Sequence, residues 1–356
     1  MKKMTIAVIG QGRSGKDIHC KYFFSELNQN TEVKYIVEEI KERREIAKEE
    51  YGCEVFENYT ELFGKTDIDL VVNASYSEQH YIVTKDLLEH GFNVLVEKPF
   101  SRTYFECQDL INTAKKNNVT VVAFHQSLFA PSYLKVKEFI NSGKLGEIFQ
   151  ISLKYSGYSR RWDWQTLQKC CGGSVYNSGP HPIGQALDLL GWDKNIRVEF
   201  SDLRTLITSG DAEDYGKIIL ACPNRPNVDI EICSVDAYAN DFVFKIFGTK
   251  GTLCSTNSHY KVKYTDLDKY EKREVIEGAL HDEKWSPLYC VDKLDFIEEE
   301  ADITGSSFDL AVKDFYDMVY GAVMEGKPMS ITPDMAAEVI RIIETTHSVN
   351  PLEVKF

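Results

Sequence analysis

Apolar residues in the first third of the chain gather in short runs, and amphipathic stretches separate these runs. Short apolar runs bounded by polar residues are typical of buried strands, whereas apolar residues three or four apart predict helices. Alternation of the two predicts a parallel sheet covered by helices on both faces. The predicted strands are residues 6–9, 33–37, 69–73, 93–96 and 119–124, and the predicted helices are 14–27, 41–51, 77–90 and 103–117.

The pattern changes after residue 125. Consecutive strand-like runs without helices between them predict a large, mainly antiparallel sheet, one face of which stays open. These runs are 147–155, 197–207, 217–221, 228–235, 242–247 and 252–255, and helices are predicted over 132–141, 177–190, 308–324 and 333–348. We therefore predict a doubly wound parallel sheet in residues 1–125 and an α+β domain in residues 126–356. The polar stretch 265–304 is predicted to be an insertion or a long excursion at the sheet edge.

The amino-acid composition narrows the classes of molecule that this protein is expected to bind. The 356 residues carry a formal net charge of −14, which argues against nucleic acid or an anionic membrane surface as a partner. No apolar run approaches the length that spans a bilayer. The nine cysteines are scattered and lack a Cys-x-x-Cys pair, so we expect reduced thiols in the cytoplasm and no metal site.

The first predicted strand ends in a glycine motif, Gly10-x-Gly12-x-x-Gly15. Three glycines between a strand and a helix suit a pyrophosphate, because they permit a tight turn, close approach of the phosphates and close helix packing. The same residues nearly match a P-loop, but Asp17 stands where a magnesium-binding Ser or Thr is needed. A turn without a ligand is the plain alternative to a Rossmann dinucleotide site.

Glu38 follows the second predicted strand, where a dinucleotide fold places the acid that binds the adenosine ribose. A carboxylate there repels a 2′-phosphate, so we expect NAD to be preferred to NADP. Ligands of such sheets lie beyond the carboxyl ends of the strands. The predicted cofactor site comprises Gly10, Gln11, Gly12, Arg13, Ser14, Gly15, Glu38, Ser75, His80, Glu97, Lys98 and Gln126.

Lys98 lies in Glu97-Lys98-Pro99, directly after the strand predicted over 93–96. The strand therefore delivers a lysine to the crevice where a nicotinamide would lie, and Pro99 restricts the conformation of Lys98. A lysine on a surface loop is often only solvated. Its position at a strand end favours a catalytic role.

Asn177 and His181 open the first long helix of the second predicted domain. They are four residues apart, so on one helix they share a face and one side chain can orient the other. A histidine is well suited to moving a proton near neutral pH, although one beside glycines often serves only in packing. The predicted catalytic residues are Lys98, His181 and Asn177.

The segment between the predicted strand 147–155 and this helix is rich in aromatic and charged residues. Planar rings can cover the apolar face of a sugar while charged side chains bind its hydroxyls, although the same segment can be a packed lid. The predicted substrate-binding residues are Lys98, Arg161, Trp162, Asp163, Tyr176, Asn177 and His181.

The chain resembles the glucose-fructose oxidoreductase and inositol dehydrogenase (Gfo/Idh/MocA) family. The matching segments are the glycine motif, residues 75–80, Glu97-Lys98-Pro99, residues 172–181, 247–251 and 326–328. The resemblance implies an NAD(P)-dependent oxidoreductase of sugars or polyols, assembled as a homodimer or homotetramer through the second-domain sheet. It also implies that Lys98 and His181 flank the reacting hydroxyl. The chain departs from the family at Asn177 and Gly184, where aspartate is frequent, and at Gln126, where asparagine is more frequent.

Three hypotheses follow from these residues. The first is hydride transfer between a nicotinamide and a secondary hydroxyl of a sugar, polyol or sugar derivative, with Lys98 as the cation and His181 as the base. The second is glycoside cleavage, in which a bound cofactor oxidises the sugar only transiently so that elimination can follow. The third is a dinucleotide-binding protein without catalysis.

Overall fold

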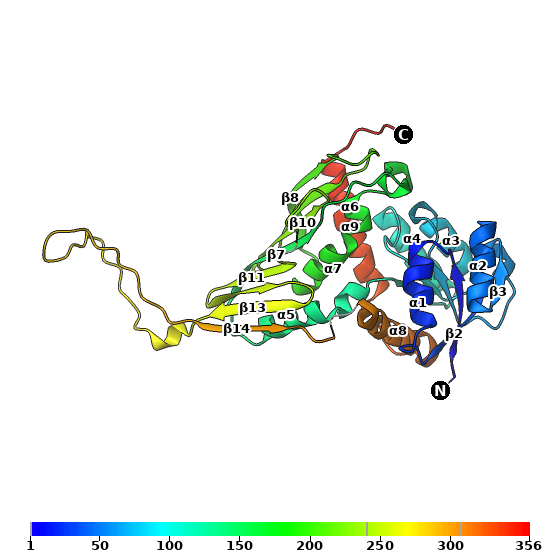
Figure 1. Ribbon diagram of the computed structural model, residues 1–356, viewed down its shortest axis with the longest axis horizontal. Helices are drawn as coiled ribbons and strands as arrows, with labels where there is room; N and C mark the ends of the chain where they lie inside the picture. Colours follow the sequence, from blue (N-terminus) through cyan, green and yellow to red (C-terminus); the bar gives the residue numbers. More distant parts are fainter. Residues whose placement is uncertain (1, 240, 306–307) are drawn as a thin grey trace.

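The computed structural model describes residues 2–239, 241–305 and 308–356. Its strands form two separate sheets, with helices packed between them (Figure 1). The helices between the sheets include α7 (Pro180–Leu189), α8 (Phe308–Glu325) and α9 (Pro333–Val349). Since α8 and α9 contact helices of the first 125 residues, the end of the chain joins the two halves of the molecule.

The first sheet is parallel throughout and has the strand order β3-β2-β1-β4-β5-β6 in the described residues. Its strands are β1 (Met4–Ile9), β2 (Thr31–Val37), β3 (Glu54–Phe56), β4 (Leu70–Asn73), β5 (Val94–Val96) and β6 (Val121–Ala123). The predicted doubly wound sheet is confirmed. Strand order reverses between β1 and β4, which opens a crevice at their carboxyl ends. The edge strand β3 was not predicted, because its three residues contain no distinctive apolar run.

Helices cover both faces of this sheet. They include α2 (Lys41–Tyr51), α3 (His80–Glu89) and α4 (Tyr104–Lys116). The helix predicted over 14–27 is shorter, because a π-helical turn (Gly15–Cys20) leads into α1 (Lys21–Phe23), where the helix ends. No helix in the described part of the chain is long and apolar enough to cross a membrane.

The second sheet has the order β14-β13-β12-β11-β7-β10-β9-β8 within the described residues. Only the β7–β10 pairing is parallel there, so the predicted mainly antiparallel sheet is confirmed. Its strands are β7 (Ile148–Ser156), β8 (Arg197–Arg204), β9 (Tyr215–Ala221), β10 (Asn227–Cys233), β11 (Phe244–Gly248), β12 (Gly251–Ser255), β13 (His259–Tyr264) and β14 (Ile297–Asp302). The last two strands were not predicted, because their residues are mostly charged and polar.

One face of this sheet packs on α7 and on α5 (Pro131–Asn141), and Figure 1 shows the opposite face without a covering helix. Ile230 and Ile232 of β10 are buried against the helices, whereas Asp229 and Glu231 lie on the other face. The predicted excursion is present, since residues 270–295 leave the sheet between β13 and β14 (Figure 1). The single helix predicted over 177–190 is instead α6 (Ser174–Asn177) followed by α7, with a turn between them.

A buried polar chain joins α8 to the loop after β5. The ring of His19, in the π-helical turn, lies with Nδ1 2.7 Å from the hydroxyl of Tyr316 on α8 and with Nε2 3.1 Å from Oε1 of Glu97. All three side chains are buried. Burial alone raises the pKa of a carboxyl, but the hydrogen bond and charge of His19 and the charge of Lys98 outweigh it and lower the pKa of Glu97 to about 2. Glu97 is therefore an ionised carboxylate inside the protein.

Replacing His19 with Leu keeps the volume of the side chain and removes the donor to Glu97. We expect the free energy of unfolding at pH 7 to fall by about 3–5 kcal/mol, because one partner of a buried pair is left unpaired. Tyr316→Phe should cost only about 1 kcal/mol, as expected for one neutral hydrogen bond. Urea denaturation measures the free energy of unfolding of both variants.

The difference between wild type and His19→Leu should depend on pH. The folded pKa of Glu97 lies below its ordinary value of 4.5, so its stabilisation is complete above that pH and is lost as the pH falls toward 2. The difference in the free energy of unfolding between wild type and His19→Leu should therefore shrink as the pH falls from 4.5 toward 2. The control is His259→Gln, which removes an exposed ion pair with Asp302 and should cost at most about 1 kcal/mol. Equal losses of unfolding free energy in His19→Leu and His259→Gln would show that the buried pair contributes no more to stability than the exposed one.

Candidate active site

A cavity of about 970 Å³ lies at the carboxyl ends of the parallel strands and continues beneath the loops of the second sheet's domain. Its walls come from the glycine loop, from the segments after β2, β4, β5 and β6, and from residues 161–181. Sixteen lining residues carry the argument below: Gly10, Gly12, Arg13, Ser14, Glu38, Arg43, Ser75, His80, Glu97, Lys98, Gln126, Arg161, Asp163, Trp164, Asn177 and His181.

The three glycines fit a bound pyrophosphate. Gly10 has a φ of +90°, and a Cβ there would lie 2.4 Å from the carbonyl oxygen of Ala74. A Cβ on Gly15 would lie 1.9 Å from the carbonyl oxygen of Gly10, so only glycine lets helix and strand approach this closely. Gly12 borders the cavity, and a Cβ there would meet no atom closer than 4.0 Å. Packing therefore requires glycine at positions 10 and 15. Gly12 instead leaves open space where an anion can approach the backbone.

Glu38 lies at the end of β2 with its side chain against the glycine loop. Its Oε2 accepts a hydrogen bond of 2.6 Å from the backbone N–H of Gln11, and its Oε1 accepts one of 2.9 Å from Ile40. Only 6% of the residue is exposed, yet it borders the cavity. Both oxygens keep a second lone pair, so the carboxylate is held in place and still accepts hydrogen bonds. Arg43 lines the same end of the cavity.

Several predicted cofactor residues stabilise the walls of the cavity. His80 holds two segments together, since its ring nitrogens lie 2.7 Å from the carbonyl oxygen of Pro99 and 3.2 Å from that of Ser75. Gln11 is buried, with its amide nitrogen 3.1 Å from the carbonyl oxygen of Gly10. Gln126, by contrast, lines the cavity with a buried amide oxygen that has no hydrogen-bond partner in the described chain. That oxygen is available to a donor on a bound ligand.

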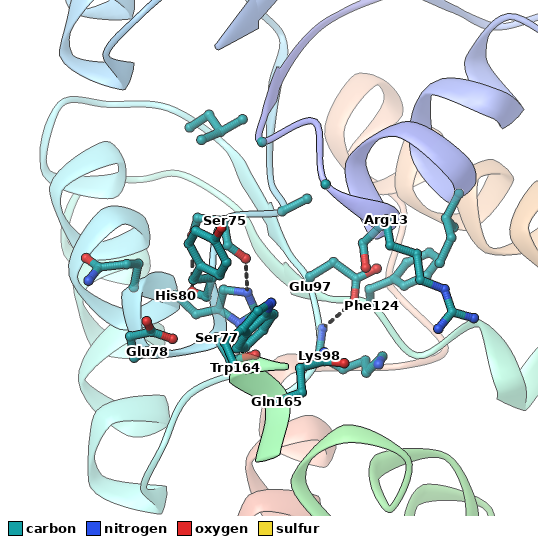
Figure 2. A pocket seen from close by; sticks show the side chains of 18 of the residues that line it. Arg13, Ser75, Ser77, Glu78, His80, Glu97, Lys98, Phe124, Trp164 and Gln165 are labelled. Atoms are coloured by element: carbon teal, nitrogen blue, oxygen red, sulfur yellow. Dashed lines mark hydrogen bonds between the residues drawn. The ribbon is translucent and has the colours of Figure 1, made fainter. Parts of the chain in front are cut away.

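The cations Arg13 and Lys98 and the carboxylate of Glu97 meet near the middle of the cavity. Figure 2 shows Lys98 beside Glu97, with Arg13 on one side and His80 and Trp164 on the other. The backbone N–H of Lys98 donates to Oε2 of Glu97 at 2.9 Å. Burial lowers the pKa of Lys98, while the Glu97 charge opposes that effect. Positive charges on Arg13 and Arg161 lower the pKa further.

Asn177 binds Lys98 and does not bind His181. Nζ of Lys98 donates to the backbone oxygen of Asn177 at 2.9 Å and to its Oδ1 at 3.2 Å, and Gln165 donates to the same Oδ1 at 3.2 Å. The expected orientation of His181 by Asn177 is therefore wrong. Asn177 and His181 do not share a helix face, because a turn at residues 178–179 separates α6 from α7.

His181 borders the same cavity from the first turn of α7. Its Nδ1 is buried and has no hydrogen-bond partner in the described residues. Burial, reinforced by the charge of Lys98 and by His125, lowers the pKa of His181 to about 3. The ring is therefore neutral near pH 7, and the partly exposed residue borders the cavity.

The aromatic segment contributes to the site through different residues from those predicted. Arg161 and Asp163 line the cavity and form an ion pair with each other. Trp162 points to solvent and is 82% exposed, and Tyr176 lies outside the cavity, where its hydroxyl donates to the backbone oxygen of Arg102 at 2.8 Å. Neither residue is among those that line the cavity.

Trp164 and Gln165 take their place in the lining (Figure 2). The ring of Trp164 lies 5.0 Å from that of Tyr76, so this segment contacts the loop after β4 across the cavity. The 3₁₀ turn Trp164–Thr166 begins after Asp163, whose side chain accepts from the N–H of Gln165. The side chain of Asp163 caps this turn through a backbone N–H, and Trp164 and Gln165 line the cavity. Among the described residues, no group of three or more His, Cys, Asp or Glu side chains is arranged to hold a metal ion.

Comparison with known proteins identifies the family. Residues 4–125 match the model of the oxidoreductase family with an NAD-binding Rossmann fold (GFO_IDH_MocA), and residues 133–254 match the GFO/IDH/MocA C-terminal domain. The chain is 30% identical over 265 residues to the uncharacterized oxidoreductase C26H5.09c of Schizosaccharomyces pombe, a match that covers 71% of this chain and 70% of that protein.

Two further relatives have named activities. The scyllo-inositol 2-dehydrogenase (NADP(+)) IolW of Bacillus subtilis is 23% identical, and the match covers 95% of this chain and 91% of IolW. The structure of a levoglucosan dehydrogenase in complex with NADH and levoglucosan superposes with a TM-score of 0.76 at 19% identity, covering 98% of each chain. The glycine cradle, the two sheets and these matches lead to one conclusion: the chain belongs to the Gfo/Idh/MocA family of oxidoreductases.

Proposed function

We propose that this protein is an NAD-dependent oxidoreductase that acts on a secondary hydroxyl of a sugar, polyol or sugar derivative. The observation that carries the proposal is the convergence of Lys98, Asn177 and His181 on one cavity that begins at the glycine loop. Alcohol oxidation needs a cation at the oxygen, a proton acceptor and a bound dinucleotide. This cavity brings together a donor cation, an acceptor nitrogen and a dinucleotide cradle.

Each end of the cavity takes part in binding the cofactor. Backbone N–H groups around Gly12 would face the pyrophosphate, Glu38 would accept from the adenosine ribose hydroxyls, and the amide oxygen of Gln126 would accept from the nicotinamide end. When bound, a nicotinamide supplies a carbon that accepts or donates hydride. The fixed position of Glu38, held by two backbone N–H groups, supports NAD over NADP.

Lys98 acts as the cation at the reacting oxygen. A lysine ammonium has three donors, and Asn177 accepts two of them, at 2.9 and 3.2 Å. The third N–H remains for a substrate oxygen. Because Asn177 fixes the direction of the side chain, Lys98 stabilises negative charge that develops on that oxygen without reorganising.

His181 acts as the acceptor of the hydroxyl proton. Nδ1 is buried, so with its proton on Nδ1 the ring would present the lone pair of Nε2 to the cavity. Its lowered pKa keeps it unprotonated across the neutral range. The positive charge formed by proton transfer lies near the carboxylate of Glu97, which favours it, and near Lys98, which opposes it.

Activity should appear in a panel of sugars, polyols and aryl glycosides incubated with NAD, with NADH absorbance and leaving-group release followed together. Net NADH from free sugars or polyols supports the proposal. Release of the leaving group without net NADH would replace it with transient oxidation and elimination. Binding of NAD without either signal would replace it with a noncatalytic role.

The first variant removes the cation. Lys98→Met keeps the side-chain length, so turnover should fall by about two to four orders of magnitude while the NAD dissociation constant changes less than about threefold. Fluorescence titration and steady-state kinetics measure the two quantities. The matched control is Lys48→Met on the exposed face of α2. Equal turnover in both variants would remove Lys98 from the mechanism.

The pH profile of kcat/KM should show no loss of activity from protonation of His181 in the neutral range. Since the pKa of His181 is about 3, loss of activity on the acid side should come below pH 5. On the alkaline side, activity should fall as Lys98 loses its proton, at a pH below the ordinary value of 10.5.

Asn177→Asp should move the alkaline limb upward by about one pH unit or more, because a carboxylate beside Nζ stabilises the ammonium. Asn227→Asp, at the exposed start of β10, should leave the profile unchanged. Activity that rises with pH through this limb would show that Lys98 works as a neutral base.

Cofactor choice tests Glu38. Glu38→Ser removes the charge that repels a 2′-phosphate and leaves Arg43 in the same wall, so the preference for NAD over NADP in kcat/KM should fall by about tenfold, or about 1.4 kcal/mol. Glu39→Ser, at the exposed neighbouring position, should change the ratio little. Equal use of NAD and NADP by the wild-type protein would refute the assignment.

A further inference from the structure

His347 and Glu213 form an ion pair beside α6. His347 lies in the last turn of α9, which runs next to α6 (Figure 1), and Glu213 lies in the loop between β8 and β9. Nε2 of His347 is 3.3 Å from Oε2 of Glu213, and only 1% of the Glu213 side chain is exposed. Neither residue lines the cavity. Burying a carboxylate costs free energy unless it is paired and hydrogen-bonded, so the other contacts of Glu213 matter.

The second carboxylate oxygen of Glu213 holds the start of α6. Its Oε1 accepts a hydrogen bond of 2.9 Å from the backbone N–H of Val175, and its backbone oxygen accepts one of 2.8 Å from Ser174. Gly173 lies directly against the carboxylate, since a Cβ there would be 2.3 Å from either oxygen. Glycine at position 173 therefore lets the carboxylate reach the backbone of α6.

α6 in turn carries Asn177, whose two oxygens accept from Nζ of Lys98 at 2.9 and 3.2 Å. A helix of four residues closes a single turn and is not stable by itself, so contacts from outside decide where it lies. Val175, which donates to Glu213, precedes Asn177 by two residues. A shift of α6 would thus move the acceptors that direct the lysine ammonium.

Both ring nitrogens of His347 face acceptors. Nδ1 lies 2.9 Å from the backbone oxygen of Ile343, and Nε2 faces the carboxylate of Glu213. Carbonyl and carboxylate oxygens only accept, so the ring satisfies both contacts only when it carries two protons. The C-terminal end of α9 favours the same positive charge. His347 is therefore an imidazolium when the pair is intact.

The charge on His347 responds to pH. Burial opposes the charge, but the hydrogen bond and the charge of Glu213 outweigh burial and raise the pKa of His347 above its ordinary value of 6.5. The ring of Tyr176 on α6 lies 4.8 Å from that of His347. Glu344, one turn earlier on α9, accepts instead from the backbone N–H of Tyr104. Since the folded pKa is raised, the pair is complete below pH 6.5 and is lost as the pH rises through the pKa of His347.

We propose that His347 and Glu213 are positioning residues, which fix α6 so that Asn177 holds the ammonium of Lys98 at the reacting oxygen. The pair lies outside the cavity and acts through α6. This inference rests on the role of Lys98 in the proposed function. It also gives the site a response to pH, because turnover is highest where His347 carries its charge and falls as the ring loses its proton.

Kinetics at pH 6.5 test the pair first. His347→Leu removes the donor to Glu213, and kcat should fall by about tenfold or more, because small displacements of a catalytic group are costly. KM and the NAD dissociation constant should each change less than about threefold. His347→Gln, whose amide donates at every pH, should keep kcat within about threefold of wild type.

The matched control is His90→Leu. His90 also follows the last turn of a helix, α3, with Nδ1 2.8 Å from the backbone oxygen of Asp86 and its ring stacked on that of Phe63. These partners belong to the first domain, so kcat should stay within about twofold of wild type. Equal losses of kcat in His347→Leu and His90→Leu would overturn the proposal.

The pH profile of kcat separates positioning from a purely structural role. In the wild type, kcat should fall in a step above pH 6.5 that precedes the limb set by Lys98. The step should be absent in His347→Gln, which has no ring to titrate, and in Glu213→Gln, whose amide donates to the neutral ring. A step unchanged in both glutamine variants would overturn the proposal.

Hydrogen exchange detected by mass spectrometry tests the pair without substrate. At pH 6.5, the amides of residues 173–178 should lose at least about fivefold of their protection in His347→Leu, and those of residues 80–90 should not change. Lost protection in a protein that forms no NADH would refute the proposed function and still support the tie between the pair and α6. Unchanged protection with unchanged kcat would overturn the inference and leave the proposed function intact.

Circular dichroism and thermal melting establish that each variant is folded. If His347→Leu does not fold, the two glutamine variants, which keep the hydrogen bond, decide the question through the pH step.

Discussion

The ionised carboxylate of Glu97 is the constraint on which the site depends. A buried charge must be fully hydrogen-bonded, and three parts of the chain meet that requirement here. The π-helical turn after the glycine loop provides His19, the loop after β5 provides the backbone N–H of Lys98, and α8 provides Tyr316 to hold the far side of His19. The same contacts that stabilise the charge therefore fix the glycine loop, the lysine and the second domain relative to one another.

This arrangement places Lys98 at the junction of the two domains. Lys98 belongs to the first domain, but the acceptors that direct its Nζ come from Asn177 in the second. Gln165, also in the second domain, holds the same amide oxygen at 3.2 Å. A change in the packing of α6 thus moves the cation without changing the cofactor cradle, so substrate chemistry and dinucleotide binding can vary independently within one fold.

The sequence predicted those features that depend on local pattern. The spacing of apolar residues was enough to predict the type of both sheets and the placement of Glu38 and Lys98 at strand ends. The spacing of the glycines was enough to predict the cradle at Gly10, Gly12 and Gly15. Features set by tertiary contact were missed. The polar strands β13 and β14 are stabilised by pairing with each other and lack an apolar alternation. His19 looked like an ordinary helix residue, because its partners Glu97 and Tyr316 lie 78 and 297 positions away. Trp162 and Trp164 are equivalent by composition, and only the turn after Asp163 decides which one faces the cavity.

Two of the three departures from the family pattern leave the site with fewer carboxylates. Asn177 and Gly184 are neutral where aspartates are frequent in the family. A side chain at Gly184 would approach Nδ1 of His125 to within 3.6 Å, so a carboxylate there would face a histidine whose pKa burial lowers to about 4. Burial is the largest cause of the lowered pKa of His125 and of His181, and Glu97 is the carboxylate whose charge opposes it at both rings. Burial also lowers the pKa of Lys98, where the charge of Glu97 again opposes it.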